Sequence, residues 1–111
     1  MKTILLSLSL FLLSVIGFSN EAKAQTFTND ASCDLLVTID YGPSCPQVTQ
    51  TVLAGAQNFS FTAPPPCNTV VSVTINDGTN SYTFFPTMSA TVPLCGATMI
   101  VDVDPATIWV H

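Results

Sequence analysis

Apolar and polar side chains alternate with a period of two along most of the chain after residue 32. In residues 33–41 the apolar positions are Cys33, Leu35, Val37, Ile39 and Tyr41. This period is typical of a β-strand with one buried face. It predicts further strands over residues 58–63, 71–76, 88–94 and 98–103, and less distinct ones over 48–53, 81–85 and 107–110. No segment has apolar residues at i, i+3, i+4 and i+7 over three turns, as an amphipathic helix would, so the pattern predicts an all-β protein.

Turn-forming residues separate these segments, and the Asn-Asp-Gly-Thr-Asn sequence at residues 76–80 is the strongest hairpin signal. Seven or eight short strands with such spacing predict a small antiparallel β-sandwich of the immunoglobulin-like kind. We expect one domain over residues 33–111, preceded by a short polar segment at residues 25–32. The Cys, Trp, Cys order of antibody domains is absent, because Trp109 follows all the cysteines.

Residues 1–24 have the three parts of an export signal. A basic start at Lys2 precedes an apolar stretch over residues 4–18, and Ala22 and Ala24 supply the small residues before a cleavage point. The apolar stretch is shorter than the roughly 20 residues needed to span a bilayer. The segment resembles secretory signals of Gram-negative bacteria, especially Bacteroidota. A lipoprotein signal needs a cysteine directly after the cleavage point, but the first one here is Cys33. We therefore expect a secreted or periplasmic protein with no lipid or transmembrane anchor.

Both lysines, Lys2 and Lys23, lie in this predicted signal, and the chain has no arginine. Residues 25–111 therefore carry six aspartates and no cationic side chain apart from the single histidine. Without lysine or arginine a protein cannot neutralise phosphates, which argues against nucleic acid as a partner. Attraction to anionic lipid is excluded for the same reason.

The four cysteines predict two disulfides, because exported chains of this size are commonly stabilised in this way. No pair has the short C-x₂₋₄-C spacing of a zinc site. Three pairings are possible. If successive strands run up and down, Cys33 and Cys95 lie at one end of the sandwich, and Cys45 and Cys67 at the other. That path predicts the pairs 33–95 and 45–67, each contributing about 3–4 kcal/mol.

Candidate chemistry is sparse. The only histidine, His111, is the last residue, where chains commonly fray. We find no catalytic set, so we expect neither enzymatic activity nor a cofactor. Asp102 and Asp104, on one side of a strand, are weak calcium candidates, and the oxygen-rich loop at residues 76–80 is expected at the opposite end. Carboxylate pairs of the glycosidase kind are less expected than solvated aspartates.

Trp109 shares one side of the last predicted strand with Thr107 and His111, while Ile108 and Val110 point the other way. Either side could face the core. For a single tryptophan we expect packing in the core or at a sheet edge before an exposed position. An outward Trp109 could stack on a sugar ring.

The sequence favours a non-catalytic binding module whose partner is a protein or a glycan. One candidate surface is an apolar patch, if Leu36, Val70 and Ile100 cluster. Alternatives are a carbohydrate-binding module and a structural subunit that assembles with itself through sheet edges such as residues 107–110. A small enzyme or inhibitor is the least expected.

Overall fold

The computed structural model describes residues 24–111, and its regular structure there consists entirely of β-strands. The strands are β1 (Ala24–Asn29), β2 (Leu35–Asp40), β3 (Val48–Val52), β4 (Phe59–Thr62), β5 (Ser72–Asn76), β6 (Ser81–Phe84), β7 (Met88–Leu94), β8 (Ala97–Val103) and β9 (Thr107–Val110). The predicted export signal lies outside the described residues except for Ala24, which begins β1. Within residues 24–111 there is no helix of the length and apolarity that crossing a membrane requires.

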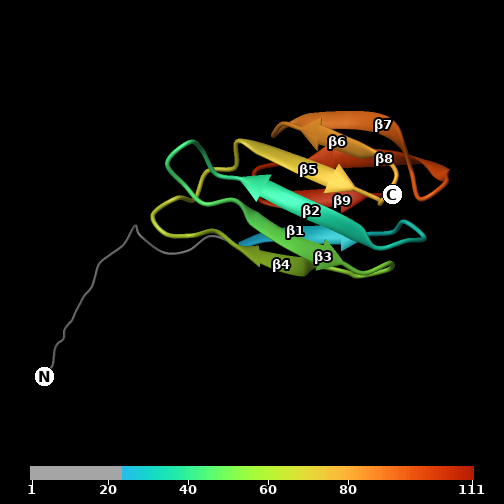
Figure 1. The fold of residues 1–111 in the computed structure, drawn as a ribbon, viewed down its shortest axis with the longest axis horizontal. Coiled ribbons are helices and arrows are strands. Elements are labelled where there is room, and N and C mark those ends of the chain that lie inside the picture. The colour runs from blue at the N-terminus through green and yellow to red at the C-terminus, as the bar shows by residue number, and fades with distance from the viewer. Residues whose placement is uncertain (1–23) are drawn as a thin grey trace, which may run out of the picture.

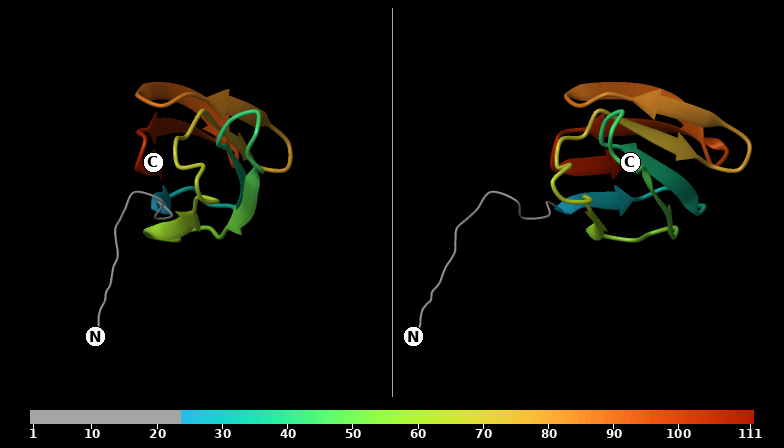
Figure 2. Two further views of the ribbon diagram at one scale, coloured as in Figure 1. Left: turned by 90° about the vertical axis from the view of Figure 1, so that its left-hand side faces the viewer. Right: turned by 60° about the vertical axis from the view of Figure 1, so that its left-hand side comes forward.

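The strands form two sheets that face each other (Figures 1 and 2). The first sheet has the order β4-β1-β9-β8-β7 and the second has the order β3-β2-β5-β6. All neighbours are antiparallel except β1 and β9, which are parallel. The predicted all-β, sandwich-like fold is confirmed. The more specific prediction of an immunoglobulin-like topology is not supported. β2 and β3 share a sheet, whereas the second and third strands of an immunoglobulin constant domain lie in different sheets.

The core lies between the sheets and is built from the inward members of each alternating segment. Phe27, Phe61 and Phe84 are the largest of its fully buried side chains. Full burial of a side chain of this size contributes about 1.5–3 kcal/mol relative to exposure. Phe61 and Phe84 occupy the inward positions that the alternation predicts.

The first strand corrects the sequence-based prediction of a polar segment at residues 25–32. β1 lies inside the first sheet, between β4 and β9. Its inward side chains are Gln25, Phe27 and Asn29, all buried. Because two of the three inward positions carry amides, the apolar alternation that identifies the other strands is missing here. The Tyr41 hydroxyl donates a hydrogen bond to Gln25 Oε1, which satisfies this buried amide oxygen.

Two disulfides join the loops at the two ends of the fold. Cys33 pairs with Cys95, and Cys45 pairs with Cys67, which is the pairing that the alternating strand path predicts. Cys33–Cys95 connects the segment before β2 to the β7–β8 turn, and so links the two sheets. Disulfides persist in oxidising compartments, so this pair of bonds indicates an extracellular type of environment.

The last strand is central in its sheet. β9 is paired on one side with β1 and on the other with β8. Residues 107–110 are therefore not a free edge. The prediction that they could pair with the sheet edge of a neighbouring molecule is wrong. The terminal residue is also held in place. His111 N–H donates to the Ile100 carbonyl, and Ile100 N–H donates to the His111 carbonyl. The expectation of a fraying terminus is therefore wrong.

Asp77 connects the β5–β6 loop to the β7–β8 turn. Its carboxylate accepts backbone hydrogen bonds from Thr79 (2.8 Å), Asn80 (2.6 Å) and Cys95 (2.8 Å). The N–H groups of Asn80, Cys95 and Thr79 hold the pKa of Asp77 below its usual value. A lowered pKa in the folded state means that the charged carboxylate stabilises the fold above about pH 4, and that this contribution is lost as the pH falls further.

We therefore expect Asp77→Asn to be less stable than the parent at about pH 7, and the difference to be smaller at about pH 3, because it shrinks as the pH falls below the unfolded pKa of about 3.9. Asparagine cannot offer two charged oxygens to the three N–H donors. At low pH the protonated aspartic acid of the parent cannot do so either, which is why the difference shrinks. Urea unfolding midpoints at both pH values measure the effect. A difference of the same size at both would contradict the role of the charge.

Candidate functional site

Trp109 lies on the outer surface of the first sheet, not in the core. Ile108 and Val110 fill the inward positions of β9 and are buried, while Trp109 is 46% exposed. This overturns the expectation that the tryptophan packs in the core or at an edge. β9 is the middle strand of five, so its outward side chains stand at the centre of the sheet surface, and Thr107 and His111 flank Trp109 on the same side.

A row of side chains crosses this surface at the level of Trp109. The strand register places Ser89 of β7 opposite Asp102 of β8, Asp102 opposite Trp109, and Trp109 opposite Thr28 of β1. Ser89 Oγ donates a hydrogen bond to Asp102 Oδ1. Neighbouring strands are about 4.8 Å apart, so the row brings residues distant in sequence within direct contact.

Two contacts fix the indole ring, and each partner is itself held by a second residue. Trp109 Nε1 donates a hydrogen bond to Asp30 Oδ2 at 2.8 Å, and Gln57 Nε2 donates to Asp30 Oδ1 at 2.7 Å. The His111 ring stacks on the indole with centroids 3.6 Å apart and an angle of 19° between the planes. His111 Nε2 lies 2.7 Å from Asp102 Oδ2. The ring is therefore held before any ligand arrives.

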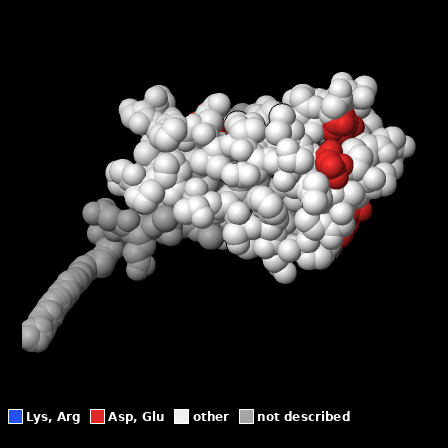
Figure 3. Space-filling model, turned by 60° about the horizontal axis from the view of Figure 1, so that its bottom comes forward, with Lys and Arg blue, Asp and Glu red and all other residues white. Residues whose placement is uncertain are grey.

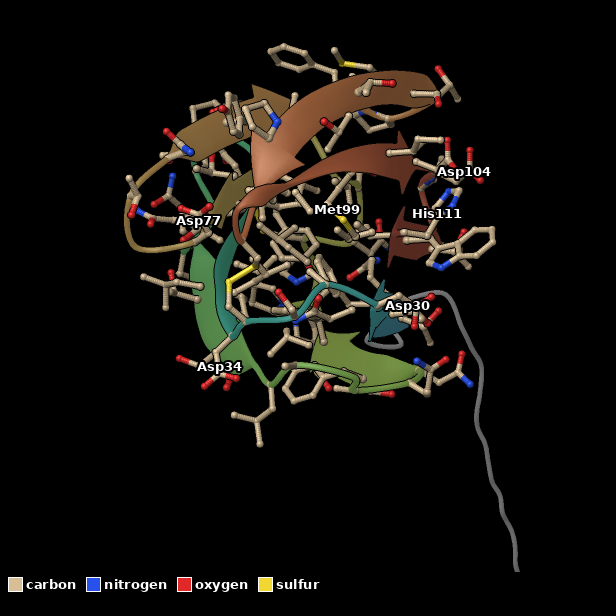
Figure 4. All side chains as sticks on the ribbon, turned by 90° about the vertical axis from the view of Figure 1, so that its right-hand side faces the viewer. Asp30, Asp34, Asp77, Met99, Asp104 and His111 are labelled. Carbon is tan, nitrogen blue, oxygen red and sulfur yellow. A yellow bond between two sulfur atoms is a disulfide. The ribbon has the colours of Figure 1, made fainter. Side chains whose placement is uncertain are left out.

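A shallow groove of about 340 Å³ lies on the Thr107 side of Trp109. Its walls include Met88, Ser89, Asp102, Asp104, Thr107 and Trp109, whereas His111 is not part of it. His111 covers one face of the indole, so the groove borders the other. We call this site the Trp109 groove. Figure 4 shows Asp30, Asp104 and His111 on one side of the molecule, and Asp34 and Asp77 on the other.

The structure brings Trp109, the predicted stacking residue, together with Asp102 and Asp104, the pair of weak calcium candidates. The loop at residues 76–80 lies at the opposite end of β8 from Asp104, as expected. Within residues 24–111, no three histidine, cysteine, aspartate or glutamate side chains are grouped as a metal site would need.

The carboxylates beside Trp109 are kept in their charged form. The indole N–H, and after it the Gln57 amide, hold the pKa of Asp30 below its usual value. The Ser89 hydroxyl and then His111 do the same for Asp102. Hydrogen bonds to the charged form are the cause in both cases. At neutral pH the surface around Trp109 is therefore negatively charged.

Serine, aspartate and histidine meet here in an order that differs from a catalytic triad. Asp102 lies between Ser89 and His111, and contacts both. In a nucleophilic triad the histidine lies between the other two and removes the serine proton. With aspartate in the middle, the arrangement orients a carboxylate and an imidazole, and the serine has no direct contact with the imidazole that serves as base in a triad.

The other candidates do not form a common site. Leu36 is exposed on the second sheet, Ile100 is exposed on the first, and Val70 is buried, so the apolar patch proposed from the sequence does not exist. On the face shown in Figure 3 most of the visible acidic surface lies at one end.

No protein-family model, curated protein or solved structure matches the chain. The function is therefore inferred from the Trp109 groove itself.

Proposed function

We propose that this protein is an exported, non-catalytic carbohydrate-binding module whose ligand lies in the Trp109 groove. The observation that carries the proposal is the tryptophan at the centre of the sheet surface, with one face covered by His111 and the other bordering a groove that is lined by two carboxylates and three hydroxyls. The disulfides support export, because they require an oxidising compartment.

A sugar ring fits this chemistry. The C–H groups on one face of a pyranose carry partial positive charge, and the face of an aromatic ring is negative, so the two attract each other. The hydroxyl groups around the sugar need acceptors and donors at the side. Asp102 uses one bond on each oxygen for Ser89 and His111, and a carboxylate has about four acceptor positions, so some remain for a ligand.

Preorganisation also favours binding. Trp109 is held by Asp30 at its edge and by His111 on one face. Fixing a side chain on binding costs about 0.5–1.5 kcal/mol, and here that cost is met during folding. Assembly through sheet edges is less favoured, because the edge strands β3, β4 and β6 are only four or five residues long, and β7 contains Pro93.

Trp109→Ala is expected to weaken oligosaccharide binding by about tenfold or more, since stacking and the associated burial amount to at least 1.4 kcal/mol. The fold should be retained, because the side chain lies outside the core. Calorimetric titration with a panel of neutral, amino and acidic oligosaccharides measures the loss. In the parent, Trp109 is the only tryptophan, so its fluorescence should also change on binding.

Leu36→Ala is the matched control. Leu36 is also 46% exposed, but lies on the other sheet, so its removal should leave affinity unchanged. Equal affinities of Trp109→Ala and the parent for every ligand that binds would place the site elsewhere. If no oligosaccharide in the panel binds the parent, the proposed function is wrong.

A further inference from the structure

The charge around the Trp109 groove is of one sign. Asp102 and Asp104 line it, and Asp30 accepts the indole N–H at the edge of Trp109. Residues 25–111 contain no lysine or arginine to offset these carboxylates. Within the described residues 24–111 the only basic side chain is His111, which is already engaged with Asp102 and stacked on the opposite face of the indole from the groove.

The exposed face of the indole also favours a positively charged ligand over a negatively charged one. An aromatic face attracts cations through its quadrupole, most strongly when the ring is tryptophan. A ligand in the groove thus meets the negative face of Trp109 on one side and the carboxylates on the others. Both features repel an anionic sugar, and both attract a sugar that carries an ammonium group.

We infer that the preferred ligands of the Trp109 groove are amino sugars with a free, protonated amine, such as oligomers of glucosamine, and that uronic acid oligomers are excluded. This inference rests on the proposed function and narrows it to a ligand class. The ammonium group would lie between Trp109 and the carboxylates of Asp102 and Asp104, while the uncharged face of the sugar stacks on the indole.

The test compares three probes of equal length at a pH below the pKa of the sugar amine. They are a glucosamine oligomer, its N-acetylated counterpart, and a galacturonic acid oligomer. We expect the glucosamine oligomer to bind about three- to tenfold tighter than the acetylated one, as two partly exposed charge contacts would give. The galacturonic acid oligomer should not bind measurably. High salt should reduce the preference, because it screens exposed charges.

Charge-removing variants assign the preference to the groove. Asp104→Asn should reduce the preference, and the double variant Asp102→Asn, Asp104→Asn should abolish it. Asp34→Asn removes the same charge on the other side of the molecule (Figure 4), and should leave the preference intact. If Asp34→Asn and Asp104→Asn act equally, the net charge of the protein is responsible and the inference is overturned.

The outcomes separate this inference from the proposed function. Equal binding of the glucosamine and N-acetylated oligomers overturns the preference for amines but supports glycan binding. Tighter binding of the galacturonic acid oligomer overturns the inference outright. Binding of an oligolysine peptide, with none of any oligosaccharide, overturns both proposals and identifies the groove as a site for a basic protein.

Discussion

Replacement of both Cys33 and Cys95 by alanine is expected to lower the free energy of unfolding by about 4 kcal/mol. The two residues are 62 positions apart in sequence, and closing a longer loop removes more entropy from the unfolded chain. In the folded protein the bond joins the segment before β2 to the β7–β8 turn. A domain of this size has a small core, so this loss is a large part of its total stability.

Alanine is a suitable replacement at Cys95 for a conformational reason. Cys95 has a φ of 57° and Gly96 a φ of 75°, so both residues of the β7–β8 turn have left-handed backbone conformations. Alanine and cysteine are both disfavoured there to a similar degree. The substitution therefore measures the disulfide, whereas glycine or asparagine at position 95 would relieve strain as well and make the loss appear smaller.

The second disulfide is the matched comparison. Cys45 and Cys67 are 22 positions apart, and their joint replacement by alanine is expected to cost about 3 kcal/mol. Urea unfolding of both variants and the parent, under non-reducing conditions, gives the three free energies. A larger loss for the 45–67 pair than for the 33–95 pair would contradict an explanation based on loop entropy.

The alternation of side chains identifies eight of the strands, because most of their inward positions are apolar. It fails for β1, where Gln25 and Asn29 are inward and buried. Their burial is possible only because hydrogen-bond partners come from distant segments, such as Tyr41 for Gln25. Local sequence does not reveal such partners, and the same holds for the parallel pairing of β1 with β9, which joins the two ends of the domain.

The orientation of β9 shows a second limit. One side of β9 carries Thr107, Trp109 and His111, and the other carries Ile108 and Val110. Hydrophobicity alone does not show which side faces the core. The neighbouring strands decide, since β9 lies between β1 and β8 with Ile108 and Val110 facing the core. Hence the sequence offered Trp109 as a stacking residue without showing that it is exposed.

One contact in the Trp109 groove, between Ser89 and Asp102, could be predicted from local sequence. A two-residue turn at positions 95–96 places residue 94 opposite 97, and by counting back along both strands Ser89 comes opposite Asp102. That register could have predicted their contact. Asp30, which contacts Trp109, and Gln57, which contacts Asp30, could not be found in this way, because the non-local arrangement of β1 and the loop after β3 brings them there.

Asn29 is the buried polar side chain with the most partners, and Asn29→Asp is expected to cost about 3–5 kcal/mol, as an unpaired buried charge does. Asn29 Nδ2 donates toward the carbonyls of Cys33 (3.1 Å), Val52 (3.2 Å) and Leu53 (3.2 Å), and Oδ1 accepts from Ala31 N–H (2.9 Å). The side chain is fully buried. Aspartate has the same shape, but puts a negative oxygen against three carbonyl oxygens and has no donor to offer them.

The pH dependence distinguishes this electrostatic cost from a simple packing defect. Burial and the facing carbonyls should raise the pKa of the new carboxyl in the folded state above its unfolded value of about 3.9. The folded protein then binds the proton more tightly, so the deficit relative to the parent should shrink as the pH falls through that raised pKa. Urea unfolding of the variant and the parent at about pH 7 and about pH 4.5 measures this change.

Asn58→Asp, which adds the same charge at an exposed position, should show little deficit at either pH. A deficit in Asn29→Asp that stays constant with pH would mean that the charge is not its cause.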